Sequence, residues 1–427
     1  MNQVDYHPMW ADLGLNLDTH DQLLAVLGKV YQDFFLSQPN RPKGMDYFNF
    51  VMSEVHGLRI KELIDARAAG RKVIGSFCLY VPEELILAVD GISVGLCAGA
   101  EFGTAKAEMF LPRTTCALIK SFFGFILEKV CPYIAASDMI VGENTCDGKK
   151  KSYEQFRKLV PNFFGMDLPQ TKSDEGRNLL RSEYVRFARA LESLSGRTIT
   201  VDSLSQAIET VNAKRQAIHR LARLRSADPA PISGLDALLI NQIYFYDDPI
   251  RFTQSVNALC DELEQRIAAG NGVFPKGHPR ILVSGCPMAI PNWKLPWIVE
   301  QNGAVIVGEE SCVGERGTRN LTSAHGDSIE TLFDNLVDRY SRIDCAIFTP
   351  NSERIDHVDS MSSAYRADGV IHYALQFCTP YQMEAFQVEK TLEEQKLPVL
   401  RIDTDYSMED VEPLRTRVEA FIERIRS

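Results

Sequence analysis

The sequence predicts an α/β protein with two domains, each built on a doubly wound, Rossmann-like parallel sheet, and with a helical connector between them. Short apolar segments that fit buried strands alternate with helical segments in residues 71–165, and the same alternation returns in residues 247–427. Residues 166–246 between them carry long, charged helical patterns. Such an alternation favours parallel strands, because each crossover returns the chain to the same edge of the sheet.

An N-terminal segment is predicted to be helical. Apolar residues recur every three to four positions in residues 22–36 and again in residues 48–70, which is the spacing of one helix face. Gly70 fits the end of this segment, because glycine often terminates helices. We therefore divide the chain into an N-terminal helical segment (1–70), a first α/β domain (71–165), a helical connector (166–246) and a second α/β domain (247–427).

Within the first domain, strands are expected at residues 71–80, 93–97 and 138–146. Helices are expected between them at residues 81–92 and 111–130, and each has a proline near its start. Ligands of such sheets bind beyond the carboxyl ends of the strands.

The second domain is expected to contain four strands, at residues 279–288, 304–312, 368–378 and 398–407. Helices separate them, and an amphipathic helix over residues 409–427 closes the chain. The two sheets look like analogous domains that could face each other across a cleft.

The bulk composition excludes several classes of protein. A formal charge of −11 over 427 residues argues against nucleic acid or an acidic membrane surface as the main partner. Apolar runs are broken by charge or glycine before they reach the length of a membrane span. The N-terminus lacks a basic region followed by an apolar region, so we expect no signal peptide and a cytoplasmic location.

The cysteines are placed where strands and helices begin or end. There are ten of them, and in a reducing compartment they are not expected to form disulfides. They form no CxxC pair or zinc-finger spacing. The cysteines at expected ends of strands or helices are Cys97, Cys116, Cys131, Cys146, Cys312 and Cys378. Thiolates gathered from scattered loops are what iron–sulfur clusters require, so we predict that these side chains converge on one.

Other motifs are absent or remain ambiguous. The stretch GENTCDGKKK departs from a phosphate-binding loop, and no GxGxxG follows a strand, so ATP hydrolysis and NAD binding are not supported. Glu315, Arg316 and Arg319 could bind an anion or deliver protons, or could form an ordinary ion-paired loop. Lys120 and the lysines at 149–151 could offset the charge of a thiolate-bound cluster or simply be solvated.

His372 lies in an apolar strand and is expected to be a buried, hydrogen-bonded core residue rather than a metal ligand.

Four stretches of the chain resemble the 2-hydroxyacyl-CoA dehydratase family, which includes the benzoyl-CoA reductase subunits. They are YVPEELILAVDGI, LPRTTCALIKSFFG, DMIVGENTCDGKKK and ADGVIHYALQFCTPY. The resemblance implies flavodoxin-like parallel sheets, an iron–sulfur cluster held by cysteines of different domains, and electrons supplied by a separate ATP-hydrolysing [4Fe–4S] activator.

Several further stretches resemble one branch of this family, the double-cubane cluster proteins. These stretches are GLCAG, KVCPY, EESCVGERGTRN and YALQFCTPYQMEA. The resemblance implies a homodimer with an [8Fe–9S] unit, in which six thiolates hold two [4Fe–4S] cubanes that share a bridging sulfide. The expected ligands are Cys97, Cys116, Cys146, Cys312, Cys345 and Cys378. Cys131 is the substitute if Cys345 is misplaced by a strand at Ala346–Phe348, whereas Cys78, Cys260 and Cys286 are assigned to packing.

Three functions follow as alternatives. The first is an ATP-dependent anaerobic reductase of small molecules, an iron–sulfur oxidoreductase with Glu315, Arg316 and Lys120 beside the cluster. The second is a component of a (R)-2-hydroxyacyl-CoA dehydratase with one [4Fe–4S] cluster and a dissimilar partner subunit. The third is an electron-transfer protein or scaffold without catalysis. The physiological substrate does not follow from the sequence.

Overall fold

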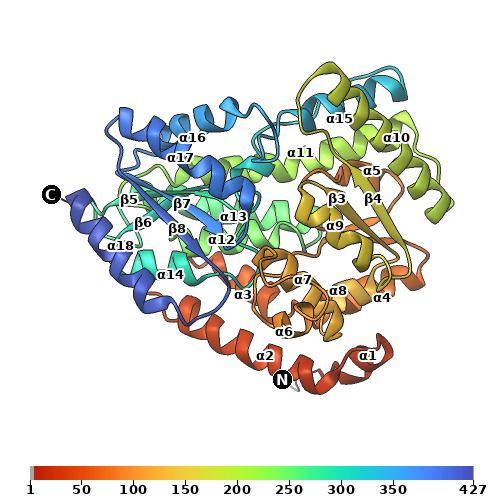
Figure 1. The fold of residues 1–427 in the computed structure, drawn as a ribbon, viewed down its shortest axis with the longest axis horizontal. Helices are drawn as coiled ribbons and strands as arrows, with labels where there is room; N and C mark the ends of the chain where they lie inside the picture. The colour runs from red at the N-terminus through yellow and green to blue at the C-terminus, as the bar shows by residue number, and fades with distance from the viewer. Residues whose placement is uncertain (1–3, 427) are drawn as a thin grey trace.

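The structure is a computed structural model that describes residues 4–426, and it contains two parallel four-stranded sheets (Figure 1). The first sheet consists of β1 (Val73–Ser76), β2 (Ile92–Gly95), β3 (Met139–Asn144) and β4 (Phe163–Asp167), in the order β2-β1-β3-β4. The second consists of β5 (Arg280–Gly285), β6 (Val305–Glu310), β7 (Gly369–Leu375) and β8 (Val399–Thr404), in the order β6-β5-β7-β8. The two orders are identical, and the predicted α/β class with two doubly wound, flavodoxin-like sheets is confirmed.

Helices cover both sheets. Those of the first are α5 (Glu83–Ala88), α6 (Thr104–Ala107), α7 (Ala117–Leu127), α8 (Pro132–Ala136) and α9 (Asp147–Phe156). Those of the second are α14 (Lys294–Gln301), the 3₁₀ turn η2 (Glu315–Gly317), α16 (Ser352–Ala364), α17 (Thr379–Glu394) and α18 (Val411–Arg426). The helix α15 (Ile329–Ser341) lies between β6 and β7 in the chain but packs with α10 (Asp174–Ser195) on the side of the first sheet (Figure 1).

The strands of each sheet end close together at its carboxyl edge, although β3 and β7 run a little past their neighbours. Ser76, the last residue of β1, pairs with Gly95 at the end of β2. In the second sheet, Ser284 pairs with Glu310, the last residue of β6, and Gly285 pairs with Tyr373 in β7. Loops that leave these edges therefore start from a common plane, and their side chains can meet.

The N-terminal helices lie along both domains (Figure 1). They are α1 (His7–Asp12), α2 (Leu17–Tyr31), the π-helix η1 (Gln32–Leu36), α3 (Met45–Ser53) and α4 (Leu58–Ala68). Phe34 of η1 stacks on Trp297 of α14 with ring centroids 4.4 Å apart. At the other end of the segment, Tyr133 of α8 donates its hydroxyl to the carbonyl of Val55. This segment therefore contacts elements of both sheets.

Four long helices lie between the two sheets in the chain: α10 (Asp174–Ser195), α11 (Val201–Leu224), α12 (Gly234–Ile243) and α13 (Pro249–Ala268). Tyr184 of α10 and Tyr340 of α15 pack edge to face, with centroids 5.6 Å apart. Tyr80, which follows β1, donates its hydroxyl to the carbonyl of Ile343, which follows α15. These contacts place α15, which comes from the second half of the chain, in the core of the first sheet.

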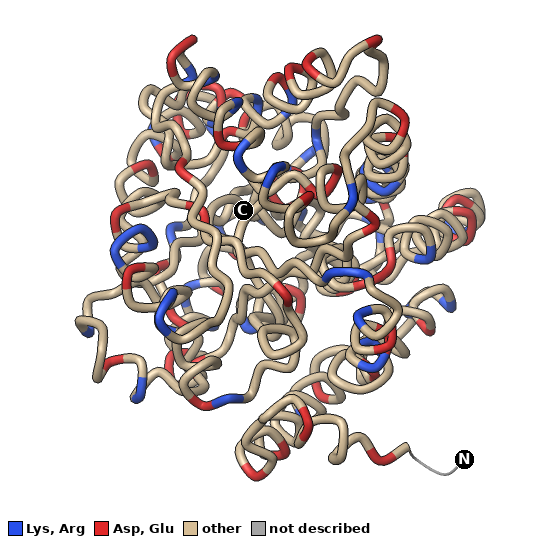
Figure 2. Tube along the Cα trace, turned by 90° about the vertical axis from the view of Figure 1, so that its right-hand side faces the viewer, with Lys and Arg blue, Asp and Glu red and all other residues tan. Residues whose placement is uncertain are grey.

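One strand was not predicted. Residues 163–167 form β4 at the edge of the first sheet, in addition to the three strands that we expected for the first domain. The sequence FFGMD is short, contains glycine and is only partly buried, so it carries a weak strand pattern. Figure 2 shows acidic and basic positions interspersed along the helices. No helix among residues 4–426 has the length and apolar character needed to cross a membrane.

Candidate functional site: a cysteine-lined cavity between the sheets

A cavity of about 140 Å³ lies between the carboxyl edges of the two sheets, and its wall is mainly apolar. Eight of the ten cysteines line it: Cys78, Cys97, Cys116, Cys146, Cys286, Cys312, Cys345 and Cys378. All six cysteines predicted to be ligands are in this set. The structure thus brings together thiols that are up to 300 residues apart in the chain, since Cys78 and Cys378 both face the cavity.

The strand ends explain how these thiols meet. One cysteine follows each of the first three strands of each sheet: Cys78, Cys97 and Cys146 follow β1, β2 and β3, and Cys286, Cys312 and Cys378 follow β5, β6 and β7. The remaining two, Cys116 and Cys345, lie in the connection between the second and third strands of their sheets, immediately before α7 and shortly before α16. The two domains therefore contribute four cysteines each, from corresponding places.

The eight cysteines fall into two groups according to which thiols affect one another's pKa through charge or hydrogen bonding. The first thiol group contains Cys116, Cys146, Cys286 and Cys378, in which Cys378 interacts with the other three. The second thiol group contains Cys78, Cys97, Cys312 and Cys345, in which Cys312 interacts with the other three. Each group draws two cysteines from each domain.

The first thiol group is held by helix starts and main-chain amides. Cys116, Cys146 and Cys378 are the N-cap residues of α7, α9 and α17. Helix N-termini present unpaired N–H groups and a partial positive charge, which favour anionic sulfur. The amide of Leu375 also donates to the sulfur of Cys286 at 3.4 Å. The hydrogen bond between the Cys116 and Cys378 thiols raises the pKa of Cys116 well above its usual range, and burial adds to this.

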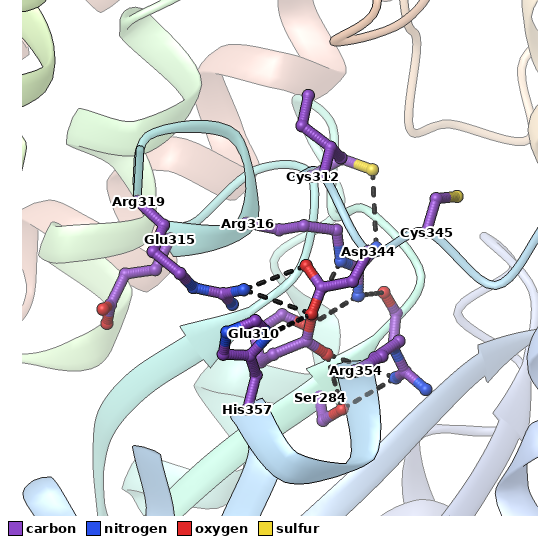
Figure 3. A network of polar contacts seen from close by, with 12 residues as sticks. Ser284, Glu310, Cys312, Glu315, Arg316, Arg319, Asp344, Cys345, Arg354 and His357 are labelled. Atoms are coloured by element: carbon purple, nitrogen blue, oxygen red, sulfur yellow. Dashed lines mark hydrogen bonds and ion pairs between the residues drawn. The ribbon is translucent and has the colours of Figure 1, made fainter. Parts of the chain in front are cut away.

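In the second thiol group, charged and hydroxyl side chains contact Cys312 and Cys345, whereas the thiol of Cys97 donates to the main-chain carbonyl of Phe77 at 3.0 Å. Nη1 of Arg316 lies 3.6 Å from Sγ of Cys312 (Figure 3). The hydroxyl of Tyr381 lies 3.7 Å from Sγ of Cys345 and also accepts a hydrogen bond from Arg316. Burial raises the pKa of Cys97 to about 12 and also raises that of Cys312, although the guanidinium of Arg316 opposes the second shift. A metal that binds such buried thiols must displace their protons.

Arg316 belongs to a buried network behind the cavity (Figure 3). Its Nε donates to Glu310 at 2.7 Å, and the other oxygen of Glu310 lies 3.2 Å from Arg354. Arg354 also donates to Ser284 at 2.9 Å and to Glu384 at 2.6 Å. The side chains of Arg316, Glu310 and Arg354 are fully buried. The network therefore fixes the guanidinium of Arg316 beside the sulfur.

Lys149 is the one charged side chain among the described residues that line the cavity. Its amine lies 3.6 Å from the carboxylate of Glu143 and 3.5 Å from the carbonyl of Phe77. Burial raises the pKa of Glu143, whose oxygens make no close hydrogen bond. The two lysines that follow, Lys150 and Lys151, are exposed.

Two of the predicted catalytic residues lie away from the cavity. Glu315 points away from Cys312 in Figure 3, and Tyr365 donates its hydroxyl to the Glu315 carboxylate. Lys120 pairs with Glu108 at 3.0 Å and donates to the carbonyl of Arg113. Of the three, the structure brings only Arg316 next to a cavity sulfur, because Arg316 turns inward from η2 while Glu315 turns outward.

The remaining cysteines occupy other places. Cys131 lines a smaller neighbouring cavity of about 60 Å³ together with His56 and Tyr133. Cys260 is buried in the core on α13, as expected. Residues 345–348 form no strand, so Cys345 is not displaced from the cavity. Cys78 and Cys286, which were assigned to packing, also face the cavity; their positions directly after β1 and β5 were the signal for this.

The thiols are spread around the wall and do not form a compact chelate. Within residues 4–426, no three His, Cys, Asp or Glu side chains come close enough together to hold a single metal ion. His372 is a buried core residue, as predicted, with Nε2 3.0 Å from the carbonyl of Tyr381. The fold and this site together define a two-domain α/β protein with a thiol-lined cavity between its domains.

Comparisons with known proteins identify the family. The model of the 2-hydroxyglutaryl-CoA dehydratase D-component family matches residues 78–425. A protein of Escherichia coli strain K12, whose provisional name is dehydratase subunit YjiM, is 34% identical over 87% of this chain and 96% of its own length. The (R)-phenyllactyl-CoA dehydratase beta subunit of Clostridium sporogenes is 29% identical over 83% of this chain and 92% of its own length. One of the benzoyl-CoA reductase subunits of Thauera aromatica is 24% identical over 83% of this chain and 91% of its own length.

The chain therefore belongs to the 2-hydroxyglutaryl-CoA dehydratase D-component family. The predicted relationship to dehydratase and benzoyl-CoA reductase subunits is confirmed. The names of the Clostridium sporogenes and Thauera aromatica relatives describe them as subunits of enzymes.

Proposed function

We propose that this protein is an ATP-dependent anaerobic reductase that holds an [8Fe–9S] double-cubane cluster in the cysteine-lined cavity. The observation that carries the proposal is the presence of all six expected ligands on one buried cavity wall. Each thiol group contains three of them: Cys116, Cys146 and Cys378 in the first, and Cys97, Cys312 and Cys345 in the second. A cluster of two cubanes needs three thiolates for each, so this division supports it.

The chemistry of the wall also fits this cofactor. Thiolates are soft ligands that suit iron–sulfur clusters. Donors to the sulfurs offset the negative charge of a thiolate-bound cluster, and they are present as helix N-termini in one group and as Arg316 in the other. The cluster would supply stored low-potential electrons for the reduction of small molecules.

The residues of this chain would hold the cluster, shield it from water and orient its thiolate ligands. The apolar wall excludes water, Arg316 and Lys149 balance charge, and the packed domains fix the thiols. A separate ATPase with its own [4Fe–4S] cluster would deliver the electrons one at a time, in the cytoplasm, to a homodimer of this chain. The sequence carries no phosphate-binding loop that would make ATP hydrolysis its own task. The candidate proton donors are Glu315, which the sequence suggested, and groups nearer the cavity.

The alternative is a component of a (R)-2-hydroxyacyl-CoA dehydratase with one [4Fe–4S] cluster. The relative of Clostridium sporogenes, which is a beta subunit of such an enzyme, favours it. In that function the three ligands of the first thiol group would suffice, and those of the second would serve packing.

Iron and acid-labile sulfide per chain in anaerobically purified protein separate the two functions. About eight irons and nine sulfides support the double cubane, about four of each support the dehydratase, and almost no iron rejects both. Cys97→Ser and Cys312→Ser should lower the iron content only if the second thiol group holds metal. Cys260→Ser is the matched control, because Cys260 is buried in α13 away from the cavity.

Cys78→Ser and Cys286→Ser test the number of ligands in each group. In the proposed function both variants keep about eight irons, since three thiolates hold each cubane. Loss of iron from either one would instead indicate four thiolate ligands in that group.

A further inference from the structure

The hydroxyl of Tyr381 lies between a fixed cation and a cysteine sulfur. Arg316 donates to the Tyr381 oxygen. A phenol oxygen that accepts from a guanidinium must direct its own hydrogen elsewhere. Sγ of Cys345, 3.7 Å away, is a partner within reach. A Cys345 thiolate, as a ligand would be, can only accept, so toward it the phenol is the hydrogen-bond donor, and the neighbouring positive charge strengthens that donor.

Arg316 is held firmly in the position that this arrangement requires. It is fully buried, pairs with Glu310, and donates to the main-chain carbonyls of Gly285 at 3.3 Å and Glu310 at 3.1 Å. Its guanidinium contacts Cys312 at the same time. Arg316 and Tyr381 thus serve the sulfurs of Cys312 and Cys345, both in the second thiol group.

The first thiol group differs in its donors. Cys116, Cys146 and Cys378 stand at the N-termini of helices, and the main-chain amide of Leu375 donates to the sulfur of Cys286. Lys120, close in sequence to Cys116, points to Glu108 instead. Side-chain substitution can therefore change the donors of the second group while leaving those of the first in place.

We propose that Tyr381, oriented by Arg316, is a positioning residue that sets the reduction potential at the second thiol group independently of the first. This inference rests on the proposed function. Reduction adds one electron, and so one negative charge, to the iron–sulfur unit beside these thiolates. Hydrogen-bond donors to sulfur stabilise the added charge and raise the potential. Loss of the phenol hydroxyl must then make that half harder to reduce.

The test compares Tyr381→Phe with Tyr246→Phe. Tyr246 also lines the cavity, but it donates its hydroxyl to the carbonyl of Cys97 at 3.2 Å and not to a sulfur. Anaerobic, iron-loaded proteins are titrated with dithionite at controlled potentials, and each one-electron step is followed by electron paramagnetic resonance. In Tyr381→Phe one midpoint should fall so that the ratio of reduced to oxidised protein at a fixed potential drops about tenfold, equal to about 60 mV. The other midpoint should stay unchanged.

Each outcome decides the inference. It is overturned if both midpoints shift equally, if neither shifts, or if Tyr246→Phe has the same effect. If Tyr381→Phe loads less iron than the wild type, Arg316→Lys replaces it, because the shorter ammonium group loses the geometry that orients the phenol while keeping the charge. A wild-type protein with only four irons would reject the proposed function, and the two-half inference with it. Eight irons with unshifted potentials would reject the inference alone.

Discussion

The two sheets of this protein supply their cysteines from corresponding positions, yet the two thiol groups are surrounded by different kinds of atoms. The first group is placed by the main chain, since Cys116, Cys146 and Cys378 occupy the N-cap positions of the helices α7, α9 and α17. The second group has side-chain donors, Arg316 and Tyr381, held by a buried ion network. Identical topology therefore fixes where the thiols are, while the loops decide their electrostatic surroundings.

This difference has a consequence for how each group can vary. A helix N-terminus is present whatever side chains follow it, so its effect on a thiolate is insensitive to most substitutions. A guanidinium can be removed by one substitution, and its partners then remain buried without it. The second group is thus the part of the site where electrostatics are most readily altered.

The largest effect on stability is expected for Arg316→Met. It deprives Glu310 of its closest partner and Tyr381 of its donor in a fully buried region. Breaking a buried pair in this way costs about 3–5 kcal/mol in the free energy of unfolding, measurable by urea denaturation at neutral pH.

Two further variants, with smaller expected losses in unfolding free energy, serve as comparisons for Arg316→Met. Lys149→Met breaks the buried pair of the first domain, but burial raises the pKa of Glu143, so this carboxyl can take up a proton. We therefore expect a smaller loss of about 1–3 kcal/mol. Arg342→Met breaks an exposed pair with Asp338 and should cost about 0.5 kcal/mol or less. A loss for Lys149→Met as large as that for Arg316→Met would contradict the distinction between the domains.

The next predicted effect is a dependence of the unfolding free energy on pH, caused by a histidine in the second sheet. Burial lowers the pKa of His372 in β7 to about 4, and the nearby cation Arg354 contributes. In the unfolded chain the ring has a pKa of about 6.5, so between these values only the unfolded state binds the proton. Stability should therefore fall as the pH falls from about 6.5 to 4, by at most about 1.4 kcal/mol per pH unit from this residue.

His372→Gln should reduce that slope. The difference in unfolding free energy between the wild type and the variant should shrink as the pH falls from 8 to 5, whatever the variant costs at pH 8. Part of the slope should remain, because burial also lowers the pKa of His20 to about 4 and that of His56 to about 3. An unchanged slope would show that His372 is protonated in the folded protein.

Much of this architecture could be predicted from local patterns. Strand ends carry cysteines within a few residues, and the alternation of strands and helices implies that those ends share an edge. The features that were missed depend on distant contacts. Tyr381 reaches Arg316 across 65 positions of the chain, and nothing beside Cys378 in the sequence shows this. Glu315 and Arg316 are adjacent in the sequence, but their side chains point in opposite directions, and only the geometry of η2 determines this.

A last prediction tests the claim that the main chain places the first thiol group. Gly124 of α7 packs directly on Gly103, and a Cβ added at Gly124 would lie 2.6 Å from the carbonyl carbon of Gly103 and 2.7 Å from the carbonyl oxygen of Phe102. These atoms belong to the main chain and cannot rotate away, so Gly124→Ala must shift α7 and with it Cys116. We expect a loss of about 1–3 kcal/mol in unfolding free energy, together with slower iron loading.

Gly28→Ala is the matched control, because Gly28 also lies within a helix, α2, and a Cβ there would meet nothing within 4 Å. The same substitution should be stabilising at that position, by up to about 1 kcal/mol, since alanine favours helix more than glycine does. Opposite signs for the two variants would show that close main-chain packing, and not glycine content as such, holds Cys116 at the cavity. If Gly124→Ala were also stabilising, α7 would be able to move without cost. The first thiol group would then depend on its side chains, as the second does.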